Sequence, residues 1–388
     1  MPIIMRSKYA IYTAILSIPL MGGIAARLLR VTIAFILRDY GLSVFEITLL
    51  SSTFMLTRGV LSPIIGKFAD KGYRRLLLIT SGLLGLALDS YLYTVVPYPF
   101  MLFLRALDGM YGAMVWPSMQ AFVHFAAKKD MKARLMSLYF IMGSLGMSIG
   151  YIVYNFLLGN LYNAIITVIV MQLSAAFVAL IFRGFEREVR KVDDRDVVEK
   201  GHGKVPVAVY TITFLFGMFV GLGNEVLMFY LAEVMGMGKY ATTSFLFFAG
   251  LYSLFGSYTT GFYADKISMD KAIVLTALFG MLSCVLISID NLFTVILGTL
   301  LFYISGRAFT PLSRSYAASK TKNIGAALGY INMSSNFGAV LSPLIGGVIM
   351  DYFGTGKIGI LNLAALTFVG MGIALLINAL ILRRKSEI

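Results

Sequence analysis

The chain alternates between long apolar runs and short polar breaks over almost its whole length. A helix that crosses a membrane needs about 20 predominantly apolar residues, and the runs are close to or above that length. The pattern therefore predicts an all-α membrane protein with twelve transmembrane helices. The predicted helices cover residues 9–37, 44–65, 76–96, 99–125, 135–158, 162–182, 205–233, 241–262, 272–289, 292–318, 324–350 and 358–381.

One polar stretch, residues 183–204, is longer than the others and carries charges of both signs. It separates six apolar runs from six. We therefore predict an N-terminal six-helix bundle over residues 1–182, a solvated cytoplasmic linker over 183–204, and a C-terminal six-helix bundle over 205–388.

A ten-residue pattern occurs twice, as GKFADKGYRR at residues 66–75 and as GFYADKISMD at 261–270. The copies start 195 positions apart (261 − 66), and Gly41 and Gly236 match at the same offset. Such a duplication predicts two pseudo-symmetric halves. Six spans in each half place the start of both halves on the same side of the membrane, so the repeats are parallel.

Hydrophobic residues make up 59% of the chain and charged residues only 13%, about half the charged share of a soluble domain. The net charge of +14 is distributed unevenly. Most Lys and Arg residues fall in the terminus, loops and tail on one side, and only Arg38, Lys239 and Lys357 fall in loops on the other. This asymmetry follows the positive-inside rule, and it predicts a multi-pass cell-membrane protein with both termini cytoplasmic, not a nucleic-acid-binding surface.

These motifs resemble those of the major facilitator superfamily across nearly the whole chain. Residues 66–75 resemble its signature loop between spans two and three, and residues 261–271 its weaker copy between spans eight and nine. Residues 105–109 resemble its fourth-span Arg-x-x-Gln-Gly motif, with Asp108 in place of Gln. The resemblance implies that family's fold and alternating access around a site near the bilayer midplane, between spans one, two, four, seven, ten and eleven. The fifth span has glycines but no proline, unlike the antiporter motif of the family.

In the resembled family the signature loop latches the two halves together on the cytoplasmic side in the outward-open state. The resemblance assigns this role here to both loops and to the arginine that opens the fifth span. The latch residues are Gly66, Asp70, Gly72, Arg74, Arg134, Gly261 and Asp265.

Charged residues inside the spans are the most informative for function. An ionised side chain at the centre of a membrane helix costs about 2.5–3.5 kcal/mol on insertion scales, so these residues should face a cavity or one another. Asp89 is expected near the outer end of its span, and Arg314 is expected to reach the cytoplasmic interface. The candidate cavity and substrate-binding residues are Arg27, Arg30, Arg58, Arg105, Asp108, Asn224, Glu225, Arg307, Asn332 and Asn336.

Two acid–base pairs follow from spacing. Arg30 and Glu225 are related by the 195-residue offset, which places them as mates in the two halves. Arg105 and Asp108 are three residues apart, on one helix face. We predict Glu225 and Asp108 as proton-coupling residues, and a purely structural salt bridge is the alternative for both pairs. Glycines 217 and 221 precede Glu225 and are expected to leave room for water or substrate.

The sequence predicts a secondary active transporter, not an enzyme, because no nucleotide-binding loop or catalytic set is visible. Six intramembrane arginines against three acids favour a small organic anion, with a proton or another coupling ion. The alternatives are a proton-driven exporter of amphipathic or cationic compounds and a lipid flippase on the same fold. We expect a monomer that contacts the lipid bilayer and its solute, with no nucleic acid, no metal and no cofactor.

Overall fold

The computed structural model describes residues 2–70, 75–126, 132–182, 207–266, 269–320 and 324–386, and almost all of these residues are helical. The first six helices are α1 (Pro2–Asp39), α2 (Val44–Asp70), α3 (Arg75–Leu92), α4 (Met101–Ala126), α5 (Lys132–Phe156) and α6 (Leu161–Ile181). The second half contains α8 (Val207–Leu222), α9 (Glu225–Phe229), α10 (Gly238–Lys266), α11 (Met269–Ser288), α12 (Leu292–Lys320), α13 (Ile324–Phe353) and α14 (Leu366–Ser386).

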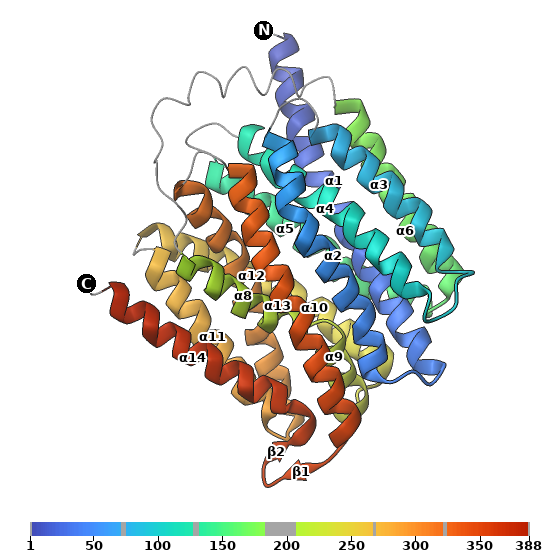
Figure 1. The fold of residues 1–388 in the computed structure, drawn as a ribbon, viewed down its shortest axis with the longest axis vertical. Helices are drawn as coiled ribbons and strands as arrows, with labels where there is room; N and C mark the ends of the chain where they lie inside the picture. The colour runs from blue at the N-terminus through green and yellow to red at the C-terminus, as the bar shows by residue number, and fades with distance from the viewer. Residues whose placement is uncertain are drawn as a thin grey trace.

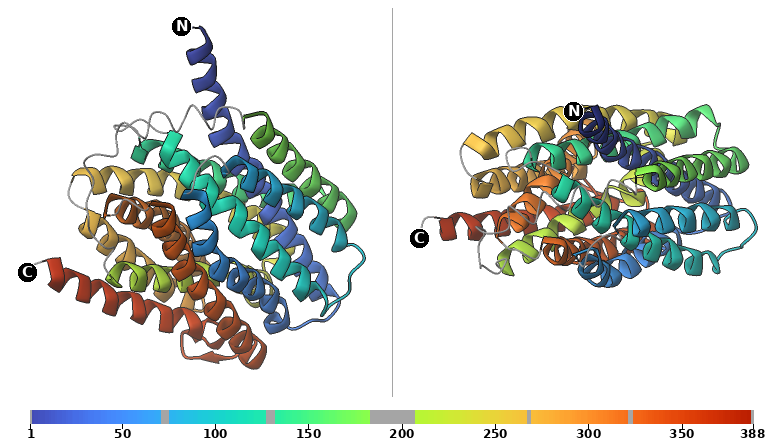
Figure 2. Two further views of the ribbon diagram at one scale, coloured as in Figure 1. Left: turned by 45° about the horizontal axis from the view of Figure 1, so that its top comes forward. Right: turned by 90° about the horizontal axis from the view of Figure 1, so that it is seen from above.

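The helices lie side by side and alternate in direction, as Figures 1 and 2 show. The start of α1 lies at one end of the molecule, and the short strands β1 (Lys357–Ile358) and β2 (Leu361–Asn362) lie at the opposite end (Figure 1). We call these two ends the terminal face and the hairpin face. Within the described residues, nine helical segments are long and apolar enough to cross a membrane.

The seventh span is broken, although the sequence predicts one continuous helix over 205–233. Helix α8 ends at Leu222, and α9 begins at Glu225 and continues into a π-helical turn at Tyr230–Val234. Asn224 between them has a non-helical backbone (φ −85°, ψ −106°). Irregular backbone at membrane depth is tolerated where protein surrounds it or where it lines a cavity. The break therefore marks a place where protein, not lipid, satisfies the backbone.

The last span begins later than predicted. Residues 357–362 form the β1–β2 hairpin, and a 3₁₀ turn at Leu363–Ala365 precedes α14. Gly359 has a positive φ of 59°, which the hairpin turn requires and a helix does not allow. The side chain of Asn362 then accepts a hydrogen bond from the Ala364 N–H and starts the turn. The predicted start at residue 358 is therefore eight residues too early.

Glycines allow the helices to approach closely. An added Cβ at Gly146 of α5 would lie 2.1 Å from the carbonyl oxygen of Leu20 on α1. The same holds for Gly217 and Gly221 of α8, whose Cβ positions would collide with Ser335 and Ser342 of α13. Helix α13 therefore fills the space directly beside these two glycines, so Gly221 does not leave the predicted room for water or substrate, whereas Gly217 also lines the cavity between the halves. Small residues at helix contacts are the usual basis of packing in membranes.

Among the described residues, one buried hydrophobic cluster spans both halves, and it includes the hairpin face. There it joins Phe35 of α1 and Tyr154 of α5 to Phe229 of α9. Towards the terminal face, the buried cluster around Phe122 belongs to the first half alone, and a separate small cluster around Ile331 belongs to the second. The halves are thus packed together at the hairpin face, and α2 and α13 also pack closely towards the terminal face, where an added Cβ at Gly329 would lie 2.9 Å from the Ser62 carbonyl oxygen.

Candidate functional site

A cavity of about 320 Å³ lies between the two halves. All six spans implied by the resemblance contribute to its wall, and α5 and α10 contribute as well. Among the described residues that line it, five are arginines and none is a carboxylate. The five arginines are Arg27, Arg30, Arg58, Arg307 and Arg314.

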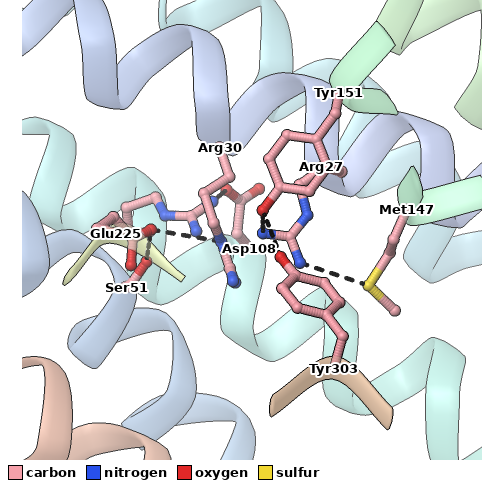
Figure 3. Close-up of polar contacts among 9 residues, drawn as sticks. Arg27, Arg30, Ser51, Asp108, Met147, Tyr151, Glu225 and Tyr303 are labelled. Atoms are coloured by element: carbon pink, nitrogen blue, oxygen red, sulfur yellow. Dashed lines mark hydrogen bonds and ion pairs between the residues drawn. The ribbon is translucent and has the colours of Figure 1, made fainter. Parts of the chain in front are cut away.

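Arg27 of α1 lies where the cavity approaches the hairpin face. Its guanidinium carbon lies 4.7 Å from the ring centroid of Tyr151, and its Nη1 donates a hydrogen bond of 2.9 Å to the Tyr151 hydroxyl. The hydroxyls of Tyr151 and Tyr303 are 3.1 Å apart. Figure 3 shows these three side chains converging from α1, α5 and α12. Arg27 is therefore oriented by aromatic groups from both halves of the chain.

Arg307 of α12 holds a similar bridging position. Its Nη1 donates to the backbone oxygen of Gly250 on α10 at 2.5 Å, and its Nη2 donates to the hydroxyl of Ser148 on α5 at 3.0 Å. An added Cβ at Gly250 would collide with that hydroxyl. The glycine thus allows Arg307 to connect the two halves across α10.

Arg58 and Arg314 lie in the part of the cavity nearer the terminal face. Arg314 is 8% exposed and donates to the backbone oxygen of Thr310 and to Oδ1 of Asn332, each at 3.1 Å. The sequence predicts that Arg314 reaches the membrane interface, but these two acceptors hold its guanidinium group inside the protein. The Nε atoms of Arg58 and Arg314 are buried and have no hydrogen-bond partner in the described part of the chain. Both guanidinium groups therefore keep a donor available.

Asn332 is not among the residues that line the cavity, where the sequence predicts it, but it joins the two halves on this side. Its Nδ2 donates to Oε1 of Gln120 on α4 at 3.0 Å, a buried contact between the two halves. The sequence predicts Asn332 as a candidate residue but does not single out Gln120. The available signal was spacing, because Gln120 lies one helical turn after Trp116, and both side chains line the cavity. Asn224 and Asn336 line it too.

A second group of charges lies behind the cavity wall. Arg30 lines the cavity, and its Nε is 3.5 Å from Oε1 of Glu225, which also accepts a 2.5 Å hydrogen bond from the Ser51 hydroxyl. Arg105 donates to Oδ2 of Asp108 at 2.8 Å. Figure 3 shows Arg30, Glu225 and Ser51 together, with Asp108 next to them. Glu225, Arg105 and Asp108 are not among the residues that line the large cavity, where the sequence analysis places them.

Asp89 lies three residues before the end of α3 at Leu92, near the end of its span as expected, and its side chain is buried, at 3% exposure. Tyr93, one turn further along, donates to Oδ2 of Asp108 at 2.8 Å. The end of α3 therefore packs its polar groups against α4 inside the first half.

Polar contacts also tie the halves together at the hairpin face. Arg38 donates to both carboxylate oxygens of Glu233, at 2.8 and 2.7 Å, and Lys239 pairs with Asp39. Lys357 pairs with Asp290 within the second half. Each basic residue that the sequence places on this side is thus paired with an acid.

Asp351 of α13 adds a different contact, because it accepts the backbone N–H groups of Val44 and Phe45 at the start of α2, at 2.8 and 2.7 Å. A carboxylate at a helix N-terminus interacts favourably with the unpaired N–H groups there. This cap joins the second half to the first half at the hairpin face.

The predicted latch lies mostly outside the described residues. Gly66 is buried in α2. Residues 72 and 74 are not described, nor are the side chains of the remaining latch residues. Those residues are Asp70, Arg134, Gly261 and Asp265.

Comparisons with known proteins agree with this architecture. The family model described as Major Facilitator Superfamily matches residues 15–305 and 253–387. The crystal structure of the human organic anion transporter MFSD10 (TETRAN) is similar in fold, with a TM-score of 0.73, 16% identity, and coverage of 96% of this chain and 99% of that one. The crystal structure of a POT family transporter in complex with a thioalcohol-conjugated peptide has a TM-score of 0.72, 13% identity, and coverage of 97% and 96%. No curated protein matches the chain significantly in sequence. The chain belongs to the Major Facilitator Superfamily of membrane transporters.

Proposed function

We propose that this protein moves a small organic anion across the cell membrane by alternating access. The observation that carries the proposal is the wall of the central cavity, where five arginines and no carboxylate are found among the described lining residues. A volume of about 320 Å³ lies at the lower end of the range of ligand pockets. It suits a small solute of a few tens of atoms at most.

The charge balance supports an anionic ligand. Glu225 compensates Arg30 from behind the wall, and Asp108 compensates Arg105. Among the charges that remain, Arg58 and Arg314 are close enough to repel each other, and each has a buried Nε without an acceptor among the described residues. Uncompensated charge in a membrane protein is costly and marks functional sites, so a carboxylate or phosphate that enters between these two arginines is stabilised by both.

The contacts at the two faces support an alternating-access cycle. The hairpin face is closed by Arg38–Glu233, by Asp39–Lys239 and by the cap from Asp351. Towards the terminal face the halves meet through the neutral Gln120–Asn332 hydrogen bond and through the packing of Gly329 of α13 against Ser62 of α2. The halves can separate at either face while the cavity keeps its place between them, as in the rocking motion of such transporters. Proton coupling is part of this proposal, and Glu225 and Asp108 are the sequence candidates for it.

The structural neighbour MFSD10 is named as an organic anion transporter. That function is consistent with the anion proposal for this chain, although the argument depends on the arginines and not on the neighbour. An exporter of cations would need an acid in the cavity wall, and the described wall offers none.

Ligand binding by the purified protein tests the proposal. The chain has one tryptophan, Trp116, and it lines the cavity, so its intrinsic fluorescence reports on ligand entry. We expect small carboxylates and organic phosphates to change the fluorescence, and lipophilic cations of similar size to leave it unchanged. The anions that bind should then exchange across the membrane of proteoliposomes that contain the protein.

The matched variants are Arg58→Gln and Lys357→Gln, which each remove one positive charge. A hydrogen bond to a charged group contributes about 1.5–3 kcal/mol, so Arg58→Gln should weaken anion binding by about 10- to 100-fold. Lys357→Gln removes a charge from the hairpin face and should not change the affinity. Equal binding of cations and anions by the wild-type protein would refute the proposal, and so would an unchanged affinity in Arg58→Gln.

A further inference from the structure

Two buried carboxyl groups, one near the end of α3 and one in the first third of α4, do not line the central cavity. Asp89 and Asp108 are 3% and 1% exposed. Tyr93 follows directly after the last residue of α3, Leu92, and its hydroxyl donates to Oδ2 of Asp108. Asp89 lies close enough to Asp108 for the two carboxyl groups to interact.

Three of the four carboxyl oxygens of this pair have no hydrogen-bond donor in the described part of the chain. Oδ2 of Asp108 accepts hydrogen bonds from Tyr93 and Arg105. Oδ1 of Asp108 and both oxygens of Asp89 are buried and receive no hydrogen bond from the described residues. A buried ionised carboxylate without donors costs far more than a hydrogen-bonded one, and a second negative charge beside it adds repulsion.

The charges around the pair do not neutralise two carboxylates. Arg105 on α4 is the cation that interacts with both acids, and its Nη1 is bonded to Asp108. Helix α6, which packs against α3, has no charged side chain, and its one titratable group, Tyr162, is exposed at the start of that helix. One guanidinium facing two carboxyl groups leaves one negative charge in excess.

We propose that Asp89 and Asp108 together hold one exchangeable proton, and that this pair is the proton site of the transport cycle. The proton resides on Asp89, whose O–H donates to the free Oδ1 of Asp108. That single proton removes the excess charge and provides a donor for an otherwise unpaired buried oxygen. The inference rests on the proposed function, because it supplies the proton step of the same transport cycle.

Glu225 is less suited to this role than the sequence analysis suggests. Its Oε1 accepts the Ser51 hydroxyl and lies 3.5 Å from Arg30, and Arg105 also attracts it. Its carboxylate therefore lies beside the Arg30 guanidinium and accepts a hydrogen bond, although Oε2 has no hydrogen-bond partner among the described residues. Neither oxygen of Asp89, by contrast, receives a hydrogen bond from the described residues.

The pair is connected to the moving half of the protein through Arg105. A second, much smaller pocket lies beside the pair, and its lining includes Tyr93, Arg105, Arg30 and Glu225. Glu225 belongs to α9 of the second half, so separation of the halves at the hairpin face moves its negative charge away from Arg105. Arg105 then interacts more strongly with Asp108, and the pair releases its proton more readily. Proton binding and the position of the second half are thus linked, and the linkage is reciprocal.

Infrared spectroscopy of the purified wild-type protein tests the proton site without any transport. A protonated carboxyl group has a C=O stretch that an ionised one lacks, and hydrogen–deuterium exchange shifts it. We expect this band at neutral pH in the wild type and its loss in Asp89→Asn, with the Glu225→Gln and Asp290→Asn variants unchanged. Absence of the band from the wild type overturns the proposal, and so does its persistence in Asp89→Asn or its loss only in Glu225→Gln.

Transport then tests the role of the site. Asp89→Asn resembles the protonated acid in size and charge, so the variant should bind the anion and exchange it across proteoliposomes as the wild type does. It should lose accumulation driven by a proton gradient, whereas Asp290→Asn retains it. If the wild type neither binds nor exchanges any anion, the proposed function fails while the infrared result still decides the proton site. If Asp89→Asn retains gradient-driven accumulation, the proton site lies elsewhere.

If Asp89→Asn fails to fold, Asp89→Glu keeps the acid and provides the same readout. A longer carboxyl group in this site changes the strength of its hydrogen bond to Asp108, so the infrared band should shift in Asp89→Glu. An unshifted band overturns the assignment to Asp89.

Discussion

Reversal of charge at Arg38 should open the hairpin face. Arg38 of α1 and Glu233 after α9 form a two-pronged ion pair between the halves, with N–O distances of 2.8 and 2.7 Å. The side chains are 31% and 36% exposed, so water screens them. Measured ion pairs of this kind contribute about 0.2–1 kcal/mol, and the two-pronged geometry places this pair at the upper end of that range.

Arg38→Glu replaces the attraction by repulsion between two carboxylates. Two unit charges about 4 Å apart in water interact by about 1 kcal/mol, so the change from attraction to repulsion amounts to about 2 kcal/mol. That energy corresponds to a shift of about 30-fold in the ratio of open to closed molecules. The Asp39–Lys239 pair and the cap from Asp351 remain, so most molecules should still close.

Cysteine labelling measures this ratio. The chain has one cysteine, Cys284, which is buried, and Cys284→Ala gives a background without cysteine. Thr48 is fully buried on α2, beside Gly347 of the other half, so Thr48→Cys reports on opening at this face. We expect a water-soluble maleimide to label it up to about 30-fold faster in Arg38→Glu.

The control is Lys357→Glu, which reverses an ion pair on the same face but inside the second half. It should leave the labelling rate unchanged. The double variant Arg38→Glu with Glu233→Arg restores opposite charges and should return the rate towards that of the wild type. Equal rates in Arg38→Glu and Lys357→Glu, or no recovery in the double variant, would show that this pair does not hold the halves together.

Two further predictions concern packing and the terminal face. Gly146→Ala should lower the melting temperature, because the added Cβ would lie 2.1 Å from the Leu20 carbonyl oxygen and overpacking costs about 1–3 kcal/mol. Gly370→Ala is the control, because its added Cβ would meet nothing within 4 Å. Equal melting temperatures of the two variants would contradict the close packing of α1 and α5. Asn332→Ala removes the contacts to Gln120 and Arg314 at a cost of about 1–3 kcal/mol for the buried groups left unpaired. A cysteine placed at Ser62, which is buried beside Gly329 of the other half, should therefore react faster in this variant than in the Asn332-containing protein. An unchanged rate would remove the Gln120–Asn332 contact from the closure.

The number and approximate position of the helices followed from the sequence, because about 20 apolar residues in a row have one stable arrangement in a bilayer. The start of α2 at Val44 and of α12 at Leu292 coincide with the predicted starts. The break at Asn224 and the hairpin before Leu366 did not follow from it. Both depend on local backbone geometry, which the apolar pattern does not encode.

The candidate charges also followed from the sequence, because few ionisable residues enter a membrane helix without a partner or a function. Arg30 and Glu225 were related by the repeat offset, and the structure places them 3.5 Å apart. Spacing along a single helix likewise placed Arg105 next to Asp108.

Only the tertiary structure decided which of these charges share a space. Arg27, Arg58 and Arg314 come from three different helices and reach one cavity, whereas Asp108 and Glu225 lie behind its wall. The contact between Asp89 and Asp108 likewise depends on how α3 packs against α4. Helix periodicity fixes which face of a helix a residue occupies, but the neighbour of that face is set by packing across segments far apart in the chain.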